Sequence, residues 1–274
     1  INEFKPDAVI GVGGYSSFPV LRFAQNKGIA TFIHESNSFA GKSNILLGKK
    51  ATKIFVASDG MENFFPKAKL MITGNPVRSA IAQSTVAKEE ALKFFGLRTD
   101  KKTVLVVGGS LGAKSINEAI DAGIDEFEKN NLQLIWQTGK PYAAQGKAGS
   151  EGRSNVWVND FITQMENAYA AADVVISRAG AMAIAEICLV AKPAVFVPYP
   201  HAAEDHQTVN AMHLVNKKAA LMVKDSEAKE KLVSTIISLA NDETKQTELK
   251  QNIKPLGVSD ADVVVATEVL KLIS

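Results

Sequence analysis

The sequence predicts an α/β protein with two domains, each built on a parallel sheet with helices on both faces. Strand-like apolar runs alternate with helix-like segments along nearly all of the 274 residues, which is typical of this class. A glycine-rich turn also occurs twice, at 11–15 after the run 7–10 and at 108–112 after the run 103–107. The length suits two domains of about 100–150 residues each.

The first part of the chain has a regular strand–helix pattern that ends near residue 74. Pro76 restricts Asn75 to extended geometry, so residues 74–78 form a turn or crossover. Strands are expected at 8–12, 30–34, 53–57 and 70–73, and helices at 20–26, 42–50 and 60–65.

The second part resumes the pattern after a polar helix at 88–95, so the domain boundary is placed near 78–88. Residues 140–153 are rich in Gly, Ala, Ser and Lys and are predicted to form a mobile surface loop. Strands are expected at 103–107, 132–137, 155–158, 174–177, 194–197 and 220–223. Helices are expected at 115–129, 164–172, 183–190, 206–217, 226–239, 244–252 and 261–272.

Composition excludes several classes of protein. A net charge of +2 with scattered lysine pairs does not indicate a nucleic-acid partner, although weak attraction to an anionic membrane surface stays open. Cys188 is the only cysteine, so an internal disulfide is excluded, and its apolar neighbours predict a buried thiol in a reducing cytoplasm. The sequence shows no signal peptide and no apolar run of about 18 residues that would span a bilayer.

The segment 108–115 is the strongest local signal for a ligand. A strand, a glycine turn and a helix start together present free backbone amides and the positive end of a dipole, which favour an anion. Ser110 can add a hydroxyl donor. The segment lacks the Gly-Lys-Ser/Thr of a P-loop and does not fit GxGxxG. The alternative is a tight turn without a ligand, and for the turn at 11–19 the two interpretations weigh equally.

Polar residues 34–37 follow a predicted strand. The carboxyl edge of an open α/β sheet is where ligands bind, so these side chains indicate hydrogen bonding to a hydroxyl-rich ligand such as a sugar. The alternative is a helix cap formed by Ser36, Asn37 or Ser38.

The segment 177–186 again joins a strand end to a helix. Gly180 supplies the turn, Met182 and Ala183 open the helix, and Glu186 follows about one turn later. A carboxylate there can accept two ribose hydroxyls. Taken alone, a surface glutamate that stabilises the helix N-terminus is the better interpretation.

The segment 198–207, together with Asn210, is a polar junction between a loop and a helix. His201, Asp205 and His206 match no zinc spacing, so ligand hydrogen bonding or capping by Asp205 is favoured over a metal. No Ser–His–Asp signature of a hydrolase is found.

The ordered set of motifs resembles the MurG family, bacterial transferases that add N-acetylglucosamine to lipid-linked N-acetylmuramyl-pentapeptide and so convert lipid I to lipid II. The motifs are Gly-Gly-Tyr at 13–15, His-Glu-Ser-Asn at 34–37, Gly-Asn-Pro-Val-Arg at 74–78, Gly-Gly-Ser-Leu-Gly-Ala at 108–113, Ser-Arg-Ala-Gly at 177–180 with Glu186, and Glu-Asp-His-Gln at 204–207 with Asn210. Their order and spacing agree over essentially the whole chain.

The resemblance implies a GT-B glycosyltransferase fold, in which two Rossmann-like domains with parallel sheets face each other across a cleft. We expect an incomplete acceptor-side N-terminal domain at 1–80 and a UDP-sugar-binding domain at 81–257. Residues 258–274 would form a helix that packs back on the N-terminal domain.

The resemblance also implies a role for each matching residue in binding UDP-N-acetylglucosamine, mainly on the C-terminal domain. Arg78 and Ser110 hold the diphosphate beside the phosphate-loop residues Gly108, Gly109 and Gly112. The backbone of Ile162 reads the uracil edge. Phosphate and ribose lie on the turn of Ala181, Met182, Ala183, Ile184, Ala185 and Glu186, with Glu186 on the ribose hydroxyls. Gln207, with Asn210 nearby, and Asn37 from the N-terminal domain contact the donor sugar.

The implied chemistry is direct displacement at the anomeric carbon with inversion. Amides, Ser110 and Arg78 stabilise the leaving diphosphate, and neither a cofactor nor a metal is implied. A base must take the acceptor proton, and His34 or Glu35 is the best candidate among the residues present.

Three departures from the family pattern matter. Ser36 stands where the family usually has Gln, and Ala183 stands where Thr is common, which removes one hydroxyl from the phosphates. Relatives begin with another glycine-rich loop that has no counterpart here, so we expect an N-terminally truncated chain. The absent part would carry much of the acceptor site, part of the membrane-binding surface and a favoured base, so activity of this chain by itself is left open.

The implied partners are the UDP-sugar donor, the lipid-linked acceptor and the inner face of the cytoplasmic membrane, to which the protein attaches peripherally. Another GT-B enzyme, such as a UDP-N-acetylglucosamine 2-epimerase or a glycosyltransferase with a different acceptor, would share the donor cleft. A non-catalytic UDP-sugar-binding module is the alternative from another class. A dehydrogenase is disfavoured because no GxGxxG with a downstream acid occurs.

Overall fold

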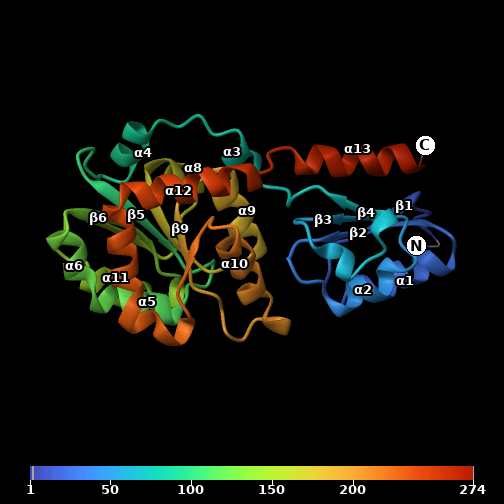
Figure 1. Cartoon of the computed structure of the whole chain (residues 1–274), viewed down its shortest axis with the longest axis horizontal. Coiled ribbons are helices and arrows are strands. Elements are labelled where there is room, and N and C mark those ends of the chain that lie inside the picture. The colour runs from blue at the N-terminus through green and yellow to red at the C-terminus, as the bar shows by residue number, and fades with distance from the viewer. Residues whose placement is uncertain (2, 274) are drawn as a thin grey trace. The chain divides into compact units, whose positions relative to one another are not determined.

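The computed structural model describes residues 1 and 3–273, and the chain divides into two compact units. One contains residues 1–77 together with 258–274, and the other contains 78–257. Each unit is a parallel sheet flanked by helices (Figure 1), which confirms the predicted fold class. Within the described residues, no helix combines the length and the apolar character needed to cross a membrane.

The first unit is built on four parallel strands in the order β1-β2-β3-β4. The strands are β1 (Ala8–Gly11), β2 (Ala30–Glu35), β3 (Lys53–Val56) and β4 (Leu70–Ile72). Helices α1 (Ser17–Asn26) and α2 (Lys42–Gly48) cover one face, and α13 (Ala261–Ile273) lies on the other (Figure 1). The helix expected at 60–65 is only the 3-10 turn η1 (Met61–Asn63), and a second turn, η2 (Lys67–Lys69), precedes β4.

Alternation along the strands divides the first core between the two faces of this sheet. Ile33 and Ile54 pack with Leu21 and Leu47 of the overlying helices. Their neighbours Phe32 and Phe55 are fully buried and stack with ring centroids 6.1 Å apart. Because successive side chains point to opposite faces, this aromatic pair belongs to the face of α13.

The second unit is built on six parallel strands in the order β10-β9-β8-β5-β6-β7. The strands are β5 (Lys102–Val107), β6 (Leu132–Gln137), β7 (Val156–Asn159), β8 (Val174–Ser177), β9 (Ala194–Phe196) and β10 (Leu221–Met222). The principal helices are α3 (Ser79–Ala82), α4 (Lys88–Phe94), α5 (Lys114–Ala122), α6 (Ile124–Lys129), α7 (Ala143–Gly149), α8 (Met165–Ala171), α9 (Ala181–Leu189), α10 (His206–Asn216), α11 (Ala228–Asn241) and α12 (Glu243–Ile253). Short 3-10 turns are η3 (Lys140–Tyr142), η4 (Ala203–Asp205), η5 (Asp225–Glu227) and η6 (Lys254–Leu256).

The strand order of the second sheet contains a topological switch point between β5 and β8. The chain runs from β5 outward through β6 and β7, then returns to β8 on the other side of β5 and continues through β9 and β10. In open α/β sheets the crevice outside the strand ends at such a point is the usual ligand site. The two loops that border this crevice are 108–113 and 178–180.

Two segments of the second unit differ from the sequence-based prediction. The helix expected at 115–129 is divided at Gly123, where a Cβ would lie 2.9 Å from Val233. The predicted mobile loop at 140–153 is wrong, because most of it is helical. Tyr142 donates a hydrogen bond of 2.7 Å to Asp121, and Gly146 packs on Thr138, so tertiary contacts fix a segment whose composition is that of a loop.

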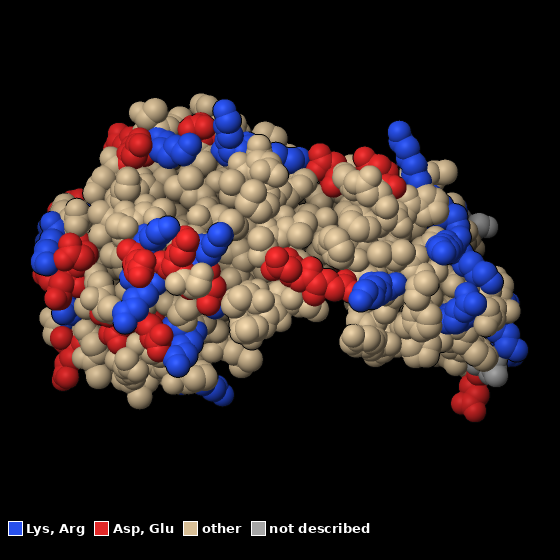
Figure 2. All heavy atoms as spheres, turned by 60° about the horizontal axis from the view of Figure 1, so that its bottom comes forward, with Lys and Arg blue, Asp and Glu red and all other residues tan. Residues whose placement is uncertain are grey.

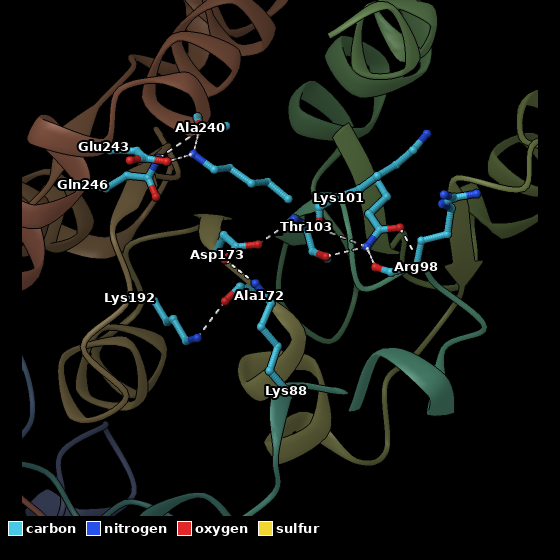
Figure 3. Close-up of polar contacts among 12 residues, drawn as sticks. Lys88, Arg98, Lys101, Thr103, Ala172, Asp173, Lys192, Ala240, Glu243 and Gln246 are labelled. Atoms are coloured by element: carbon cyan, nitrogen blue, oxygen red, sulfur yellow. Dashed lines mark hydrogen bonds and ion pairs between the residues drawn. The ribbon is translucent and has the colours of Figure 1, made fainter. Parts of the chain in front are cut away.

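A dense polar network lies at the amino edge of the second sheet, the end at which its parallel strands begin (Figure 3). Asp173, just before β8, pairs with Lys88 and accepts the Thr103 amide at 2.8 Å. Lys192 donates to the Ala172 carbonyl at the C-terminus of α8. Lysines at helix C-termini satisfy carbonyls that lack a helical partner, so these contacts fasten helices to the sheet.

Candidate functional site

The loop after β5 packs so closely on neighbouring backbone that two of its positions, Gly108 and Gly112, have no room for a side chain. Gly112 has φ +76°, and a Cβ there would lie 1.9 Å from the Thr138 carbonyl oxygen. A Cβ on Gly108 would lie 2.5 Å from the Ala113 amide nitrogen. The loop therefore packs backbone to backbone on the residues after β6, while Ser110 is exposed at its tip.

Gln137, at the end of β6, connects this loop to the segment before α8. Its Nε2 donates to the Gly109 carbonyl at 2.9 Å, and its Oε1 accepts the Ile162 amide at 2.8 Å. Gln137 is 3 % exposed. Gln137 is not among the predicted site residues, although a polar side chain at the carboxyl end of a buried strand is a signal for a site residue.

The N-terminus of α9 lies across the switch point and has no side-chain cap. Gly180 has an ordinary φ of −67°, and no atom lies within 4 Å of the position where its Cβ would be. Gly180 thus lies at the predicted turn, as the N-cap of α9, but its backbone conformation does not require glycine. Its missing side chain leaves open space beside the first turn of α9, where Met182 is 42 % exposed. Backbone amides and the helix dipole favour an anion in such a place.

Glu186, in the second turn of α9, is held by two partners from other segments. Its Oε1 lies 3.3 Å from Nη2 of Arg78, and its Oε2 accepts a 2.9 Å hydrogen bond from Tyr169. The Glu186 side chain is 12 % exposed and that of Arg78 is 57 % exposed. The structure thus brings together two residues that the sequence assigned separately to ribose and diphosphate, and adds Tyr169.

Arg178 fixes the loop that follows β9. Its guanidinium donates to the Val197 and Pro198 carbonyls at 3.0 and 3.1 Å, pairs with Asp225, and reaches Ser115 at the start of α5. These contacts connect the ends of β8 and β9 to α5, the helix that follows the 108–113 loop.

Two further predicted residues lie on α10. Gln207 accepts the Tyr199 amide at 3.0 Å, and Asn210, which is 3 % exposed, donates to the Ala179 carbonyl at 3.2 Å. Both side chains contact backbone around the β8 and β9 loops.

In the first unit, His34 lies buried at the end of β2. Its Nε2 is 3.0 Å from the Gly74 carbonyl, and Ser36 Oγ is 3.3 Å from its Nδ1. Burial lowers its pKa against the opposing effects of Gly74 and Glu35. At neutral pH the ring is therefore the neutral form, with its proton on Nε2 to donate to Gly74.

Glu35 organises the loop between β2 and α2. One carboxylate oxygen accepts the backbone and side-chain N–H groups of Asn37, and the other accepts from Gly41 and Asn44, with distances from 2.8 to 3.3 Å. Helix α2 begins after Gly41 without a side-chain cap, so the alternative that Ser36, Asn37 or Ser38 caps this helix is wrong.

Other polar candidates do not form a metal centre. Across residues 1 and 3–273, no three His, Cys, Asp or Glu side chains gather as metal ligands would. Cys188 is 3 % exposed, and burial raises the pKa of its thiol to about 12. This confirms the predicted buried thiol, which is protonated at neutral pH and unreactive.

Comparison with known proteins identifies the relatives of this chain. The glycosyltransferase family 28 C-terminal domain matches residues 103–264, and the N-terminal domain of that family matches residues 1–56. The UDP-N-acetylglucosamine--N-acetylmuramyl-(pentapeptide) pyrophosphoryl-undecaprenol N-acetylglucosamine transferase of Parabacteroides distasonis is 49 % identical over 275 aligned residues. That alignment covers 100 % of this chain and 75 % of the relative.

Solved structures agree with this relationship. A crystal structure of Acinetobacter baumannii MurG superposes with a TM-score of 0.79 at 29 % identity, covering 98 % of this chain and 75 % of that one. A UDP-GlcNAc 2-epimerase from Neisseria meningitidis, solved with UDP-GlcNAc, gives 0.68 at 16 % identity over 98 % of this chain and 77 % of that one, and shows the shared fold alone. With its two parallel-sheet units of the GT-B type, the chain belongs to glycosyltransferase family 28 and, within it, to the MurG family.

Proposed function

We propose that this chain transfers N-acetylglucosamine from UDP-N-acetylglucosamine to lipid-linked N-acetylmuramyl-pentapeptide. The observation that carries this proposal is 49 % identity, over the whole chain, to enzymes named for that reaction. An acceptor hydroxyl oxygen forms a bond to the anomeric carbon as the bond to the UDP oxygen breaks. UDP leaves with the bonding electrons, and the hydroxyl proton passes to a base.

The donor is proposed to bind at the switch point of the second unit. Amides of the 108–112 loop and of the first turn of α9, together with Ser110 and Arg78, would stabilise charge that develops on the diphosphate. The exposed loop tip and the open space beside Gly180 support this placement.

The remaining donor contacts follow from the same placement. Glu186 would accept the ribose hydroxyls, and the Ile162 backbone would read uracil. Gln207 would contact the sugar with Asn210 beside it, and Asn37 stays a predicted sugar contact.

The identity of the base stays a prediction. The contacts of His34 and Glu35 support a positioning role, because Glu35 accepts four N–H donors and the His34 ring is buried between Gly74 and Ser36. A base needs a lone pair directed at the acceptor. We therefore propose that this pair shapes the acceptor-side loop.

Peripheral attachment to the inner face of the cytoplasmic membrane is proposed for the first unit. On α1 and α2, Phe23 and Leu46 are 40 % and 55 % exposed, and Arg22, Lys27 and Lys49 are exposed on the same helices or at their ends. Figure 2 shows Lys and Arg along the flank of this unit, at the right of the view. Exposed apolar side chains with basic neighbours favour an anionic lipid surface.

The test is product analysis with labelled UDP-N-acetylglucosamine, with and without lipid I. Label in lipid II supports the proposal. Epimerised UDP-sugar without acceptor would identify a 2-epimerase, transfer to another acceptor only would change the substrate, and donor binding without turnover would identify a binding module. Calorimetry of Arg78→Ala, with weaker UDP-sugar binding expected in a folded protein, tests the diphosphate contact.

A further inference from the structure

Tyr169 is a buried phenol whose polar contact lies in the proposed donor site. It belongs to α8, is 4 % exposed, and donates a 2.9 Å hydrogen bond to Oε2 of Glu186. Within residues 1 and 3–273, Glu186 is the only hydrogen-bond partner of the Tyr169 hydroxyl. Burial, followed by the charge and hydrogen bond of Glu186, raises the pKa of Tyr169 well above its usual value. The hydroxyl therefore stays protonated and donates throughout the pH range in which enzymes work.

The two oxygens of Glu186 have different environments. Oε2 is held from inside by Tyr169, whereas Oε1 faces Arg78, whose side chain is 57 % exposed. Because the guanidinium of Arg78 is exposed, water or a ligand can reach it and take its place beside Oε1. A buried hydrogen bond to a carboxylate is stronger and directional. Oε1 is therefore the oxygen that can exchange its partner for a ligand hydroxyl.

We infer that Tyr169 is a positioning residue that orients Glu186 so that its second oxygen meets the ribose hydroxyls of a uridine diphosphate. This rests on the proposed function, in which Glu186 accepts those hydroxyls. Without the phenol, Oε2 loses its donor and the carboxylate can rotate toward Arg78 or water. A ligand would then have to order Glu186 on binding, which lowers affinity.

The test compares UDP with 2′,3′-dideoxy-UDP, which lacks both ribose hydroxyls, by calorimetry on the full chain. Wild type should bind UDP at least tenfold more tightly than it binds 2′,3′-dideoxy-UDP. Tyr169→Phe should bind UDP five- to tenfold more weakly and bind the dideoxy ligand within twofold of wild type. On a Glu186→Ala background, Tyr169→Phe should have no further effect, because coupled residues are not additive.

Tyr142 supplies the matched control. It is also a largely buried tyrosine that donates to a carboxylate, Asp121, at 2.7 Å, but it is the last residue of η3, directly before α7. Tyr142→Phe should leave both affinities unchanged. The inference would be overturned, and the proposed function kept, if Tyr169→Phe weakened the binding of both ligands equally. The same would follow if Tyr169→Phe kept the full wild-type preference for UDP over the dideoxy ligand. Failure of wild type to bind UDP, or to discriminate the ligands, would overturn the proposed function with it.

Discussion

The two edges of the six-stranded sheet use polar residues in opposite ways. At the amino edge, Asp173, Lys88 and Lys192 are paired with one another or with backbone groups from neighbouring elements. At the carboxyl edge, Ser110 is exposed, α9 begins without a side-chain cap, and the exposed Arg78 meets the largely buried carboxylate of Glu186. The polar residues named at the amino edge are paired within the protein. At the carboxyl edge Gln137 and Arg178 are paired as well, but Ser110 and Arg78 are exposed and can donate to a ligand.

This contrast shows that polarity alone does not mark a site. Buried polar groups that are fully paired stabilise a fold, whereas a ligand needs groups whose partners are absent or easily displaced. Substitutions at the amino edge should therefore change the free energy of unfolding, and substitutions at the carboxyl edge should change donor affinity.

Among the polar residues, the largest effect is expected for Asp173→Ala. The change removes the partner of Lys88 and the acceptor of the Thr103 amide, so the free energy of unfolding should fall by about 2–3 kcal/mol in urea denaturation. UDP affinity of the folded variant should match wild type. Asp100→Ala is the control, because Asp100 pairs with Arg98 on the surface and should change stability far less. A folded Asp173→Ala protein with weakened UDP binding would contradict the separation of the two edges.

Lys192 gives a pH-dependent test of the same edge. Burial, with smaller contributions from Lys88 and Lys250 and against the attraction of Asp173, lowers its pKa to about 8. Because this lies below the unfolded value, the unfolded chain binds more protons between the two values and stability rises with pH. Relative to Lys192→Met, wild type should gain about 2 kcal/mol between pH 7 and pH 9.5. A flat difference in urea denaturation across that range would contradict the low pKa.

Sequence reasoning found what depends on local chemistry. The alternation of strand-like and helix-like segments predicted the parallel sheets. The turn at 108–112 was predicted from its glycines, and the structure gives the reason for them, because a side chain at Gly108 or Gly112 would collide with neighbouring backbone. Gln137 and Tyr169 escaped notice because their importance lies in partners 25 and 17 residues away. The helix α7 was missed for the same reason, since Tyr142 anchors it to Asp121. Sequence spacing predicts elements, but long-range hydrogen bonds decide which polar residues matter.

Gly180→Ala tests the carboxyl edge of the sheet, and its expected effect is smaller than that of Asp173→Ala. The φ of −67° suits alanine and the added Cβ meets no atom within 4 Å, so the free energy of unfolding should stay within about 0.5 kcal/mol of wild type. The methyl group would, however, occupy the space proposed for the diphosphate, and UDP affinity should fall about tenfold, or about 1.4 kcal/mol.

Gly112→Ala is the matched opposite. Its Cβ would collide with the Thr138 carbonyl at a φ of +76°. The free energy of unfolding of this variant should therefore fall so far that its UDP affinity cannot be compared with that of wild type. If Gly180→Ala bound UDP as tightly as wild type, the open space beside α9 would not receive the donor. The exposed groups at the carboxyl edge would then not mark the donor site.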